Sequence, residues 1–177
     1  MDLDMKWACV PILVVTSACA STGYVPRPFP LPNRPAIEST PHVPAAGPGD
    51  MYALVGTALS LRGAPYRNGG SDPSGFDCSG FTQYVFGQHG LPLAREVREQ
   101  YRQGAVVDPR DLAPGDLVFF STTDPGASHV AIVVGGDEFV HAPSTTGVVR
   151  VERLGARYWS ERFIGARRVT AATTTSQ

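Results

Sequence analysis

The first regular pattern of apolar residues begins at position 51 and has the spacing of one helix face. It consists of Met51, Leu54, Val55, Ala58 and Leu59. Asp50 can cap the amino end of this helix, and Gly63 followed by Pro65 ends it. The pattern therefore predicts a helix that starts at position 51.

Two further helices follow. Phe81, Tyr84 and Val85 form one apolar stripe, which predicts a helix over 78–88. Asp77 is a natural N-cap for it. A polar segment predicts a third helix at about 94–103.

After position 114 the apolar residues cluster in short runs, and the period changes from that of helices to that of strands. The predicted strands are 117–120, 130–134, 138–142, 148–151 and 163–169. Gly135, Gly136 and Asp137 predict a hairpin turn between two of them. Helices come first and strands later, which predicts an α+β domain with helices packed on a mostly antiparallel sheet.

The chain before position 51 has no such periodicity. Residues 7–20 are an apolar run of signal-peptide length, too short to span a bilayer comfortably. The segment that ends at Cys19 resembles a bacterial lipobox. We predict a signal peptide over 1–19 with Cys19 lipidated; an ordinary secretory signal and an uncleaved anchor remain as alternatives. Met5 is an alternative start to Met1, because the aspartates at positions 2 and 4 do not fit a positively charged leader.

Residues 20–50 contain eight prolines and predict an extended tether. The folded domain is predicted over 51–170, and a disordered tail over 171–177. Ala20 after the lipidation site favours anchoring in the outer membrane, facing the periplasm, so the protein is predicted to be exported to the cell envelope. The 177 residues carry a net charge of −1, which gives no reason to expect a nucleic-acid partner.

Cys78 is the only one of the three cysteines in the predicted domain. It stands at a predicted helix start, where the helix dipole favours a thiolate. Gly75 and Gly80 on either side leave room for backbone amides to approach an oxyanion. A nucleophilic thiol and a small buried apolar residue are both compatible with this position.

A nucleophilic cysteine needs a base. His129 and His141 lie at the two ends of the predicted hairpin, symmetric about Gly135. With an odd-numbered loop they oppose each other on one face, about 5 Å apart at Cβ, whereas a two-residue loop separates their faces. The pair favours a relay in which one imidazole takes the thiol proton and the other orients it. A zinc site is disfavoured, since the ligand spacings typical of zinc motifs do not occur, and two structural histidines are the remaining alternative.

Taken together, several segments of the domain resemble the NlpC family of bacterial cell-wall cysteine peptidases, which have a papain-like fold. In order, they are GAPYRNGG (63–70), FDCSGF (76–81), ARxxxxQ (94–100), LAPGDLVFF (112–120), SHVAIVVGGDEFVHA (128–142) and YWSERFIGARRV (158–169). The resemblance covers essentially the whole predicted domain. It implies the papain-like version of the α+β fold.

The resemblance also implies roles for individual residues. Cys78 is the expected nucleophile, His129 the base, and His141 the third member that orients His129. Tyr66 is expected to stabilise the oxyanion together with the Cys78 amide. The residues expected to bind substrate are Asp77, Ser79, Arg95 and Ser128, with Gln100 bordering the cleft. Ala94 and Glu96 depart from the residues common at their positions.

The implied function is hydrolysis of an amide bond in the stem peptides of peptidoglycan or in their crosslinks. The expected protein is a monomer, needs no metal or cofactor, and reaches the membrane only through Cys19. A non-catalytic wall-binding lipoprotein and a thiol acyltransferase with the same chemistry are the alternatives.

Overall fold

A computed structural model describes residues 50–171 of the chain. The predicted signal peptide, the lipidation of Cys19, nearly all of the tether and the tail after 171 lie outside these residues and stay predictions. Among the described residues, no helix is both long and apolar enough to cross a bilayer.

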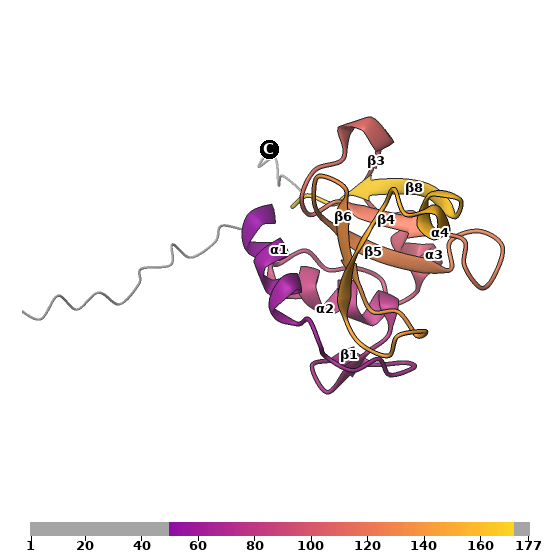
Figure 1. Ribbon diagram of the computed structural model, residues 1–177. Helices are drawn as coiled ribbons and strands as arrows, with labels where there is room; N and C mark the ends of the chain where they lie inside the picture. The colour runs from indigo at the N-terminus through magenta and orange to yellow at the C-terminus, as the bar shows by residue number, and fades with distance from the viewer. Residues whose placement is uncertain (1–49, 172–177) are drawn as a thin grey trace, which may run out of the picture. The chain divides into compact units, whose positions relative to one another are not determined.

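The centre of the domain is an antiparallel sheet of six strands (Figure 1). In spatial order they are β3 (Ala105–Val107), β8 (Phe163–Arg168), β4 (Leu117–Phe120), β5 (His129–Gly135), β6 (Glu138–His141) and β7 (Arg150–Arg153). The central strands β4 and β5 are almost entirely buried. A separate small hairpin pairs β1 (Ser71–Asp72) with β2 (Gly75–Phe76).

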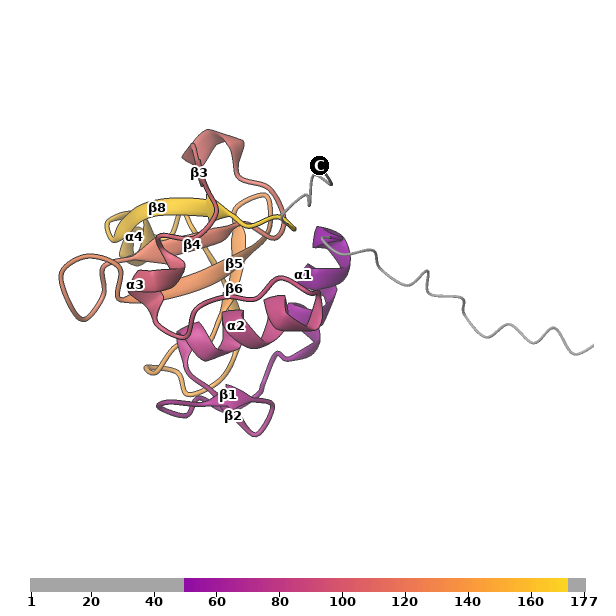
Figure 2. The ribbon, with the colours of Figure 1, turned by 180° about the vertical axis from the view of Figure 1, so that it is seen from behind.

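Two helices cover one face of this sheet, and both begin at a capping aspartate. In α1 (Met51–Ser60), Asp50 Oδ1 accepts hydrogen bonds from the backbone of Tyr52 at 3.0 Å and of Ala53 at 3.1 Å. In α2 (Cys78–Gln88), Asp77 Oδ1 accepts one from Gly80 at 2.7 Å. Figures 1 and 2 show α1 and α2 together on the same side of the molecule. Both predicted helix starts are therefore confirmed.

The alternation of side chains along β4 divides the interior into two apolar clusters. Leu117 and Phe119 pack with α1 and α2, whereas Val118 and Phe120 pack on the opposite face. The second face is covered in part by the short helix α4 (Arg157–Ser160), whose Trp159 is buried in that cluster. Six phenylalanines are completely buried, and each stabilises the fold by about 2–3 kcal/mol, so the core is dominated by aromatic burial.

The predicted third helix is much shorter than expected. Only α3 (Val97–Gln100) is helical, because side chains compete for the flanking backbone. Gln103 accepts from the Ala94 N–H at 2.8 Å, and Gln100 donates to the Ala94 carbonyl at 2.8 Å. These bonds provide partners for the backbone N–H and carbonyl of Ala94 in a loop, so neither group needs a helical turn.

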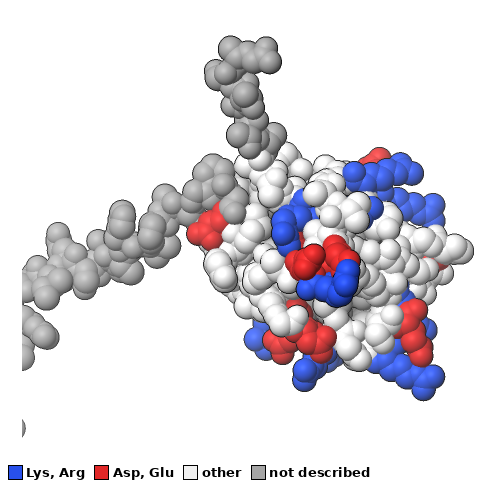
Figure 3. All heavy atoms as spheres, turned by 90° about the horizontal axis from the view of Figure 1, so that it is seen from above, with Lys and Arg blue, Asp and Glu red and all other residues white. Residues whose placement is uncertain are grey.

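The other differences are at the edges of the sheet. The predicted strand at 148–151 is shifted to Arg150–Arg153, and β3, the β1–β2 hairpin, α4 and the 3-10 turn η1 (Pro109–Asp111) were not predicted. The prediction of an α+β domain with helices on an antiparallel sheet is confirmed. On the face in Figure 3, acidic and basic side chains lie close to one another in small groups.

Candidate active site

Cys78 is the first residue of α2 and is half-buried beside the apolar core. Its thiol lies close to β5: the backbone N–H of Val130, a residue of that strand, donates a hydrogen bond to it. The loop before α2 packs tightly here: a Cβ on Gly80 would stand 2.0 Å from the Gly70 carbonyl oxygen. Glycine at position 80 thus allows the approach that brings the loop against the start of α2.

The thiol is less acidic than its helix position predicts. Burial, followed by the nearby charge of Asp77, raises the pKa of Cys78 to about 11. The N–H groups of Val130, Ser79 and Cys78 act in the opposite direction but do not compensate. The expectation that the helix start favours a thiolate is therefore corrected: loss of hydration outweighs the backbone donors, and the resting group is a neutral thiol.

The two histidines reach one face of the sheet through a bulge. Gly135 pairs with Glu138, so the hairpin loop has two residues, which alone would send the histidines to opposite faces. A register shift between Val133 and Gly135 adds a residue to β5, and this extra residue returns the side chains of the two histidines to the same face. His129 and His141 are consequently diagonal neighbours on one face, instead of the directly opposed pair that we expected for an odd-numbered loop.

Their rings are joined edge to face. His129 Nε2 and His141 Nδ1 are 2.8 Å apart, and the ring planes meet at 86°. The Trp159 ring stacks on His129, with centroids 5.4 Å apart and an angle of 27°. The predicted juxtaposition of the two histidines is confirmed, and Trp159 covers the pair.

Both imidazoles are held neutral. Burial and the neighbouring His141 lower the pKa of His129 to about 3. Burial and the Arg150 guanidinium lower the pKa of His141 to about 3. Each ring therefore has one N–H donor and one acceptor nitrogen. Because Nε2 of His129 is engaged with His141, its Nδ1 is the nitrogen left to receive a proton from a thiol.

Tyr66 lies near Cys78. It forms a bridge with Phe76, two residues before the cysteine, and its ring is partly buried. Burial first, then the nearby Cys78 and Asp77, raise the pKa of its phenol. The hydroxyl therefore stays protonated and can donate a hydrogen bond beside the thiol.

Three of the predicted substrate-binding residues contact each other. Arg95 forms an ion pair through Nη2 with Asp77 and also donates through Nη1 to Asp77 at 3.0 Å and to Ser79 at 2.8 Å. Gln100, beneath them, donates to the Ser79 carbonyl at 3.0 Å. These bonds hold the start of α2 in place; binding of substrate by the same three residues stays a prediction.

Ser128 has a comparable structural task. Its hydroxyl accepts hydrogen bonds from the backbone of Thr122 at 2.8 Å and of Thr123 at 3.3 Å, and so ties together the loop before β5. It also lines an open hollow of about 470 Å³ with Glu96, Arg98 and Asp124. Its predicted contact with substrate is untested by this geometry.

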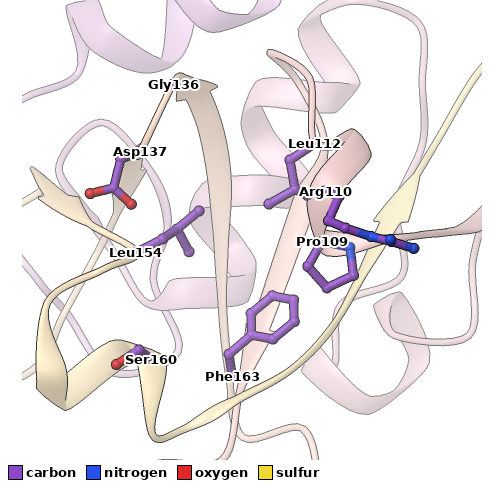
Figure 4. A pocket seen from close by; sticks show the side chains of 8 residues that line it. All are labelled: Pro109, Arg110, Leu112, Gly136, Asp137, Leu154, Ser160 and Phe163. Carbon is purple, nitrogen blue, oxygen red and sulfur yellow. The ribbon is translucent and has the colours of Figure 1, made fainter.

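His129 opens onto a small hollow of about 60 Å³. The lining residues are Thr122, Thr123, His129, Pro143, Ser144, Thr145, Tyr158 and Trp159. A larger hollow of about 360 Å³, shown in Figure 4, is formed by η1, the turn between β5 and β6, and residues from Leu154 to Phe163. It contains none of the predicted site residues, so the smaller hollow is the one next to the candidate chemistry.

Two residues at the site were not identified from the sequence. Trp159 lies in a segment that carried the family resemblance but had no assigned role, and Glu152 lies just beyond the predicted strand at 148–151. The stacking of Trp159 and the position of Glu152 behind His141 depend on the pairing of β6 with β7, which no local pattern indicates. Among residues 50–171, no three His, Cys, Asp or Glu side chains gather as a metal-ligand set.

Comparison with known proteins gives a consistent result. The NlpC/P60 family profile matches residues 63–168. The chain is 39% identical over 127 residues to the gamma-DL-glutamyl hydrolase of Bacillus subtilis, covering 70% of this chain and 31% of that protein. It is 43% identical over 121 residues to the murein DD-endopeptidase MepS/murein LD-carboxypeptidase of Escherichia coli, covering 68% of this chain and 60% of that one. It therefore spans less than two thirds of either relative.

Solved structures show the same relationship. An NlpC/P60 family protein from Bacillus cereus superposes with a TM-score of 0.67 at 33% identity, over 71% of this chain and 42% of that one. RipD from Mycobacterium tuberculosis, a non-catalytic NlpC/p60 domain protein described as adapted to peptidoglycan binding, has a TM-score of 0.57 at 27% identity, over 67% of this chain and 97% of that one.

Proposed function

Since the chain belongs to the NlpC/P60 family and shares its papain-like fold, we propose that it is a peptidoglycan endopeptidase with a Cys78–His129–His141 site. The bond it cleaves is an amide within the wall stem peptides or their crosslinks. The observation that carries the proposal is the 2.8 Å contact between His129 and His141, at the end of β5 where Val130 contacts the Cys78 thiol. The name of the Escherichia coli relative, a murein endopeptidase, supports a peptidoglycan substrate, and the name of the Bacillus subtilis relative supports hydrolysis of a glutamyl amide bond.

The reaction starts from a neutral thiol and a neutral imidazole. As Cys78 Sγ attacks the carbonyl carbon, a C–S bond forms, the carbonyl electron pair moves to oxygen, and the thiol proton passes to His129 Nδ1. His129 Nε2–H then donates to His141 Nδ1, which stabilises the new imidazolium. Moving the proton together with the attack removes the need for a resting thiolate.

Collapse of the tetrahedral intermediate breaks the C–N bond, and the leaving amine takes the proton from His129. The acyl group remains on sulfur as a thioester. Water then attacks the thioester carbonyl while His129 takes a proton from it. The C–S bond breaks, the acid product leaves, and His129 returns its proton to sulfur to restore the thiol. The low pKa of His129, caused by burial, makes its imidazolium a strong acid toward the leaving amine.

The oxyanion is held by the Cys78 backbone N–H and the Tyr66 hydroxyl. The Cys78 N–H is at the first turn of α2, where it has no partner within the helix. The raised pKa of Tyr66 keeps its proton available as a donor. Donors aligned before the reaction stabilise charge that appears only in the transition state.

The placement in the cell is also part of the proposal. Lipidation of Cys19 would anchor the protein in the envelope, with the outer membrane as the proposed location, and residues 20–50 would hold the domain toward the wall. The protein is proposed to act as a monomer, without metal or cofactor.

A non-catalytic wall-binding role is the second candidate, because RipD has this fold without catalysis. One experiment separates the two. The 177-residue chain is incubated with purified sacculi, and released fragments are identified by mass. New fragments from the wild type, absent with Cys78→Ala, support the peptidase, and their masses identify the bond. Retention of both proteins on sacculi without fragments supports the binding role and contradicts the peptidase.

A further inference from the structure

Glu152 lies on β7 directly behind the histidine pair. In the register of β6 and β7, Glu152 pairs with Phe139, and Arg150 pairs with His141. The Glu152 carboxylate has three neighbours: it accepts a hydrogen bond from the Trp159 indole through Oε2, its Oε1 is 3.2 Å from Arg150 Nε, and the same oxygen is 3.7 Å from His141 Nε2. The side chain is 24% exposed, so most of the group is within the protein.

The Glu152 carboxylate is the nearest acceptor for His141 Nε2, a buried nitrogen that otherwise has no hydrogen-bond partner among the described residues. His141 is completely buried, and within the described residues its Nε2 is the one buried side-chain nitrogen or oxygen without a hydrogen-bond partner. A buried donor without an acceptor destabilises the folded state. Glu152 Oε1 is the carboxylate oxygen next to this nitrogen. A small movement from 3.7 Å would complete the bond.

The direction of the proton chain identifies which nitrogen of His141 carries hydrogen. If His129 Nδ1 receives the thiol proton, Nε2 of that ring must carry its hydrogen and donate to His141 Nδ1. Neutral His141 then has its own hydrogen on Nε2, and that N–H is directed at Glu152. A carboxylate accepts and cannot donate, so it favours this tautomer.

Trp159 provides a second connection from Glu152 to the site. The indole N–H donates to Glu152, and the indole ring stacks on His129. The Glu152 carboxylate thus lies against both His141, which is behind the candidate base His129, and Trp159, which covers that base.

We propose that Glu152 is a positioning residue that fixes the tautomer of His141, and through it that of His129, and also sets the position of Trp159. This inference rests on the proposed function for its kinetic consequence, whereas its structural part concerns a hydrogen position that is measurable without any substrate. Glu152 is not among the residues that line the hollow next to His129, and its contacts at the site are with His141 and Trp159, so it acts through these residues.

The charged groups around His141 determine how the loss of Glu152 should change the pKa values of the two histidines. The groups that face this ring are His129 from β5 and both Arg150 and Glu152 from β7. Arg150 lowers the pKa of His141, while Glu152 raises the pKa of His129. Removal of the carboxylate therefore removes a charge that raises the pKa of His129, and makes His129 a weaker base.

The first test is nitrogen NMR on the 177-residue chain labelled with ¹⁵N-histidine. We expect the wild type at pH 7 to carry the His141 proton on Nε2, and Glu152→Ala to give a mixture of tautomers or the Nδ1–H form. Glu152→Gln retains one oxygen acceptor and should keep part of the Nε2–H population. Glu161→Gln, in an exposed ion pair with Arg157, is the matched control and should leave the spectrum unchanged. An Nδ1–H tautomer in the wild type would overturn the inference without any variant.

The second test is kinetic and uses release of fragments from sacculi. Glu152→Ala should lower kcat by about 10- to 100-fold with KM within about twofold, because geometry is lost but the binding surface is not. Glu152→Gln should recover part of this loss, and the acid limb of kcat should move to lower pH in both. Wild-type kcat and pH profile in Glu152→Ala would contradict the inference while leaving the peptidase intact. No hydrolysis by the wild type, with the tautomer still dependent on Glu152, would contradict the peptidase and support the positioning role.

Discussion

The backbone N–H of Val130 donates a hydrogen bond to the thiol of Cys78. Val130 follows His129 directly in β5, so one strand carries both a donor to the sulfur and the candidate base. Helix α2 brings the cysteine to this strand from the other side of the core. The relative position of the thiol and the imidazole is therefore determined by the packing of α2 on β5, which is part of the main apolar cluster.

The acidity of Cys78 gives the first prediction. Because burial and Asp77 raise the pKa of this thiol to about 11, alkylation by iodoacetamide should rise with pH well beyond the value of about 8.5 for a free thiol. The rate is measured at Cys78 by peptide mass mapping, which separates it from Cys9 and Cys19. A rate that is already maximal at pH 7 would show a resting thiolate and contradict the neutral-thiol mechanism.

The release of wall fragments should continue at acidic pH. The pKa of His129 is lowered to about 3 by burial, so the ring remains an available base below the ordinary value of about 6.5. We expect the acid limb of kcat/KM for fragment release to lie below pH 6.5. An acid limb at or above pH 6.5 would mean that His129 is more hydrated than its buried position implies.

The site and the elements around it differ in how far the sequence determines them. Asp50 and Asp77 are local caps followed by apolar stripes, so the helix starts were predictable from residues three or four positions apart. Cys78 and the two histidines were also found, because each lies at the end of a strongly patterned element. The family resemblance then supplied their roles.

The parts that were missed depend on contacts between distant segments. The bulge in β5 decides the face of His129, yet nothing at Val133 or Val134 distinguishes a bulge from a regular strand. The ionisation of Cys78 depends on burial by α2 packing, which a helix-start argument does not include. Glu152 reaches His141 only through the pairing of β6 with β7, so no spacing along the chain associates them.

Tyr66 offers a direct test of the oxyanion site. Tyr66→Phe removes the hydroxyl and keeps the ring, so kcat should fall by about 10- to 1000-fold with little change in KM. Tyr52→Phe is the matched control, since Tyr52 is 80% exposed on α1. Equal kcat values for Tyr66→Phe and the wild type would assign the hydroxyl a packing role only.

The contacts of Asp77 predict opposite effects on stability and on the thiol. Asp77→Ala removes the cap of α2 and the partner of Arg95, so the free energy of unfolding should fall by about 1–3 kcal/mol. The same change removes a charge that raises the pKa of Cys78, so alkylation at pH 8 should become faster. Glu161→Ala, in the exposed ion pair with Arg157, serves as the control for an ordinary surface pair. Slower alkylation in Asp77→Ala would show that the helix start, and not the charge, governs the thiol.

The two buried histidines make stability depend on pH. In the unfolded chain each has a pKa of about 6.5, whereas burial lowers both folded values to about 3. Below pH 6.5 the unfolded state thus binds protons that the folded state does not. The contribution to stability is complete above pH 6.5 and is lost as the pH falls toward 3.

The loss should amount to about 1.4 kcal/mol per pH unit for each histidine, so urea unfolding at pH 7.5 and at pH 5.0 should differ by about 2 kcal/mol per ring. His141→Gln removes one titrating group and should reduce this difference by about half, even if the variant is less stable at both pH values. An undiminished difference in His141→Gln would mean that His141 is not held neutral in the folded protein.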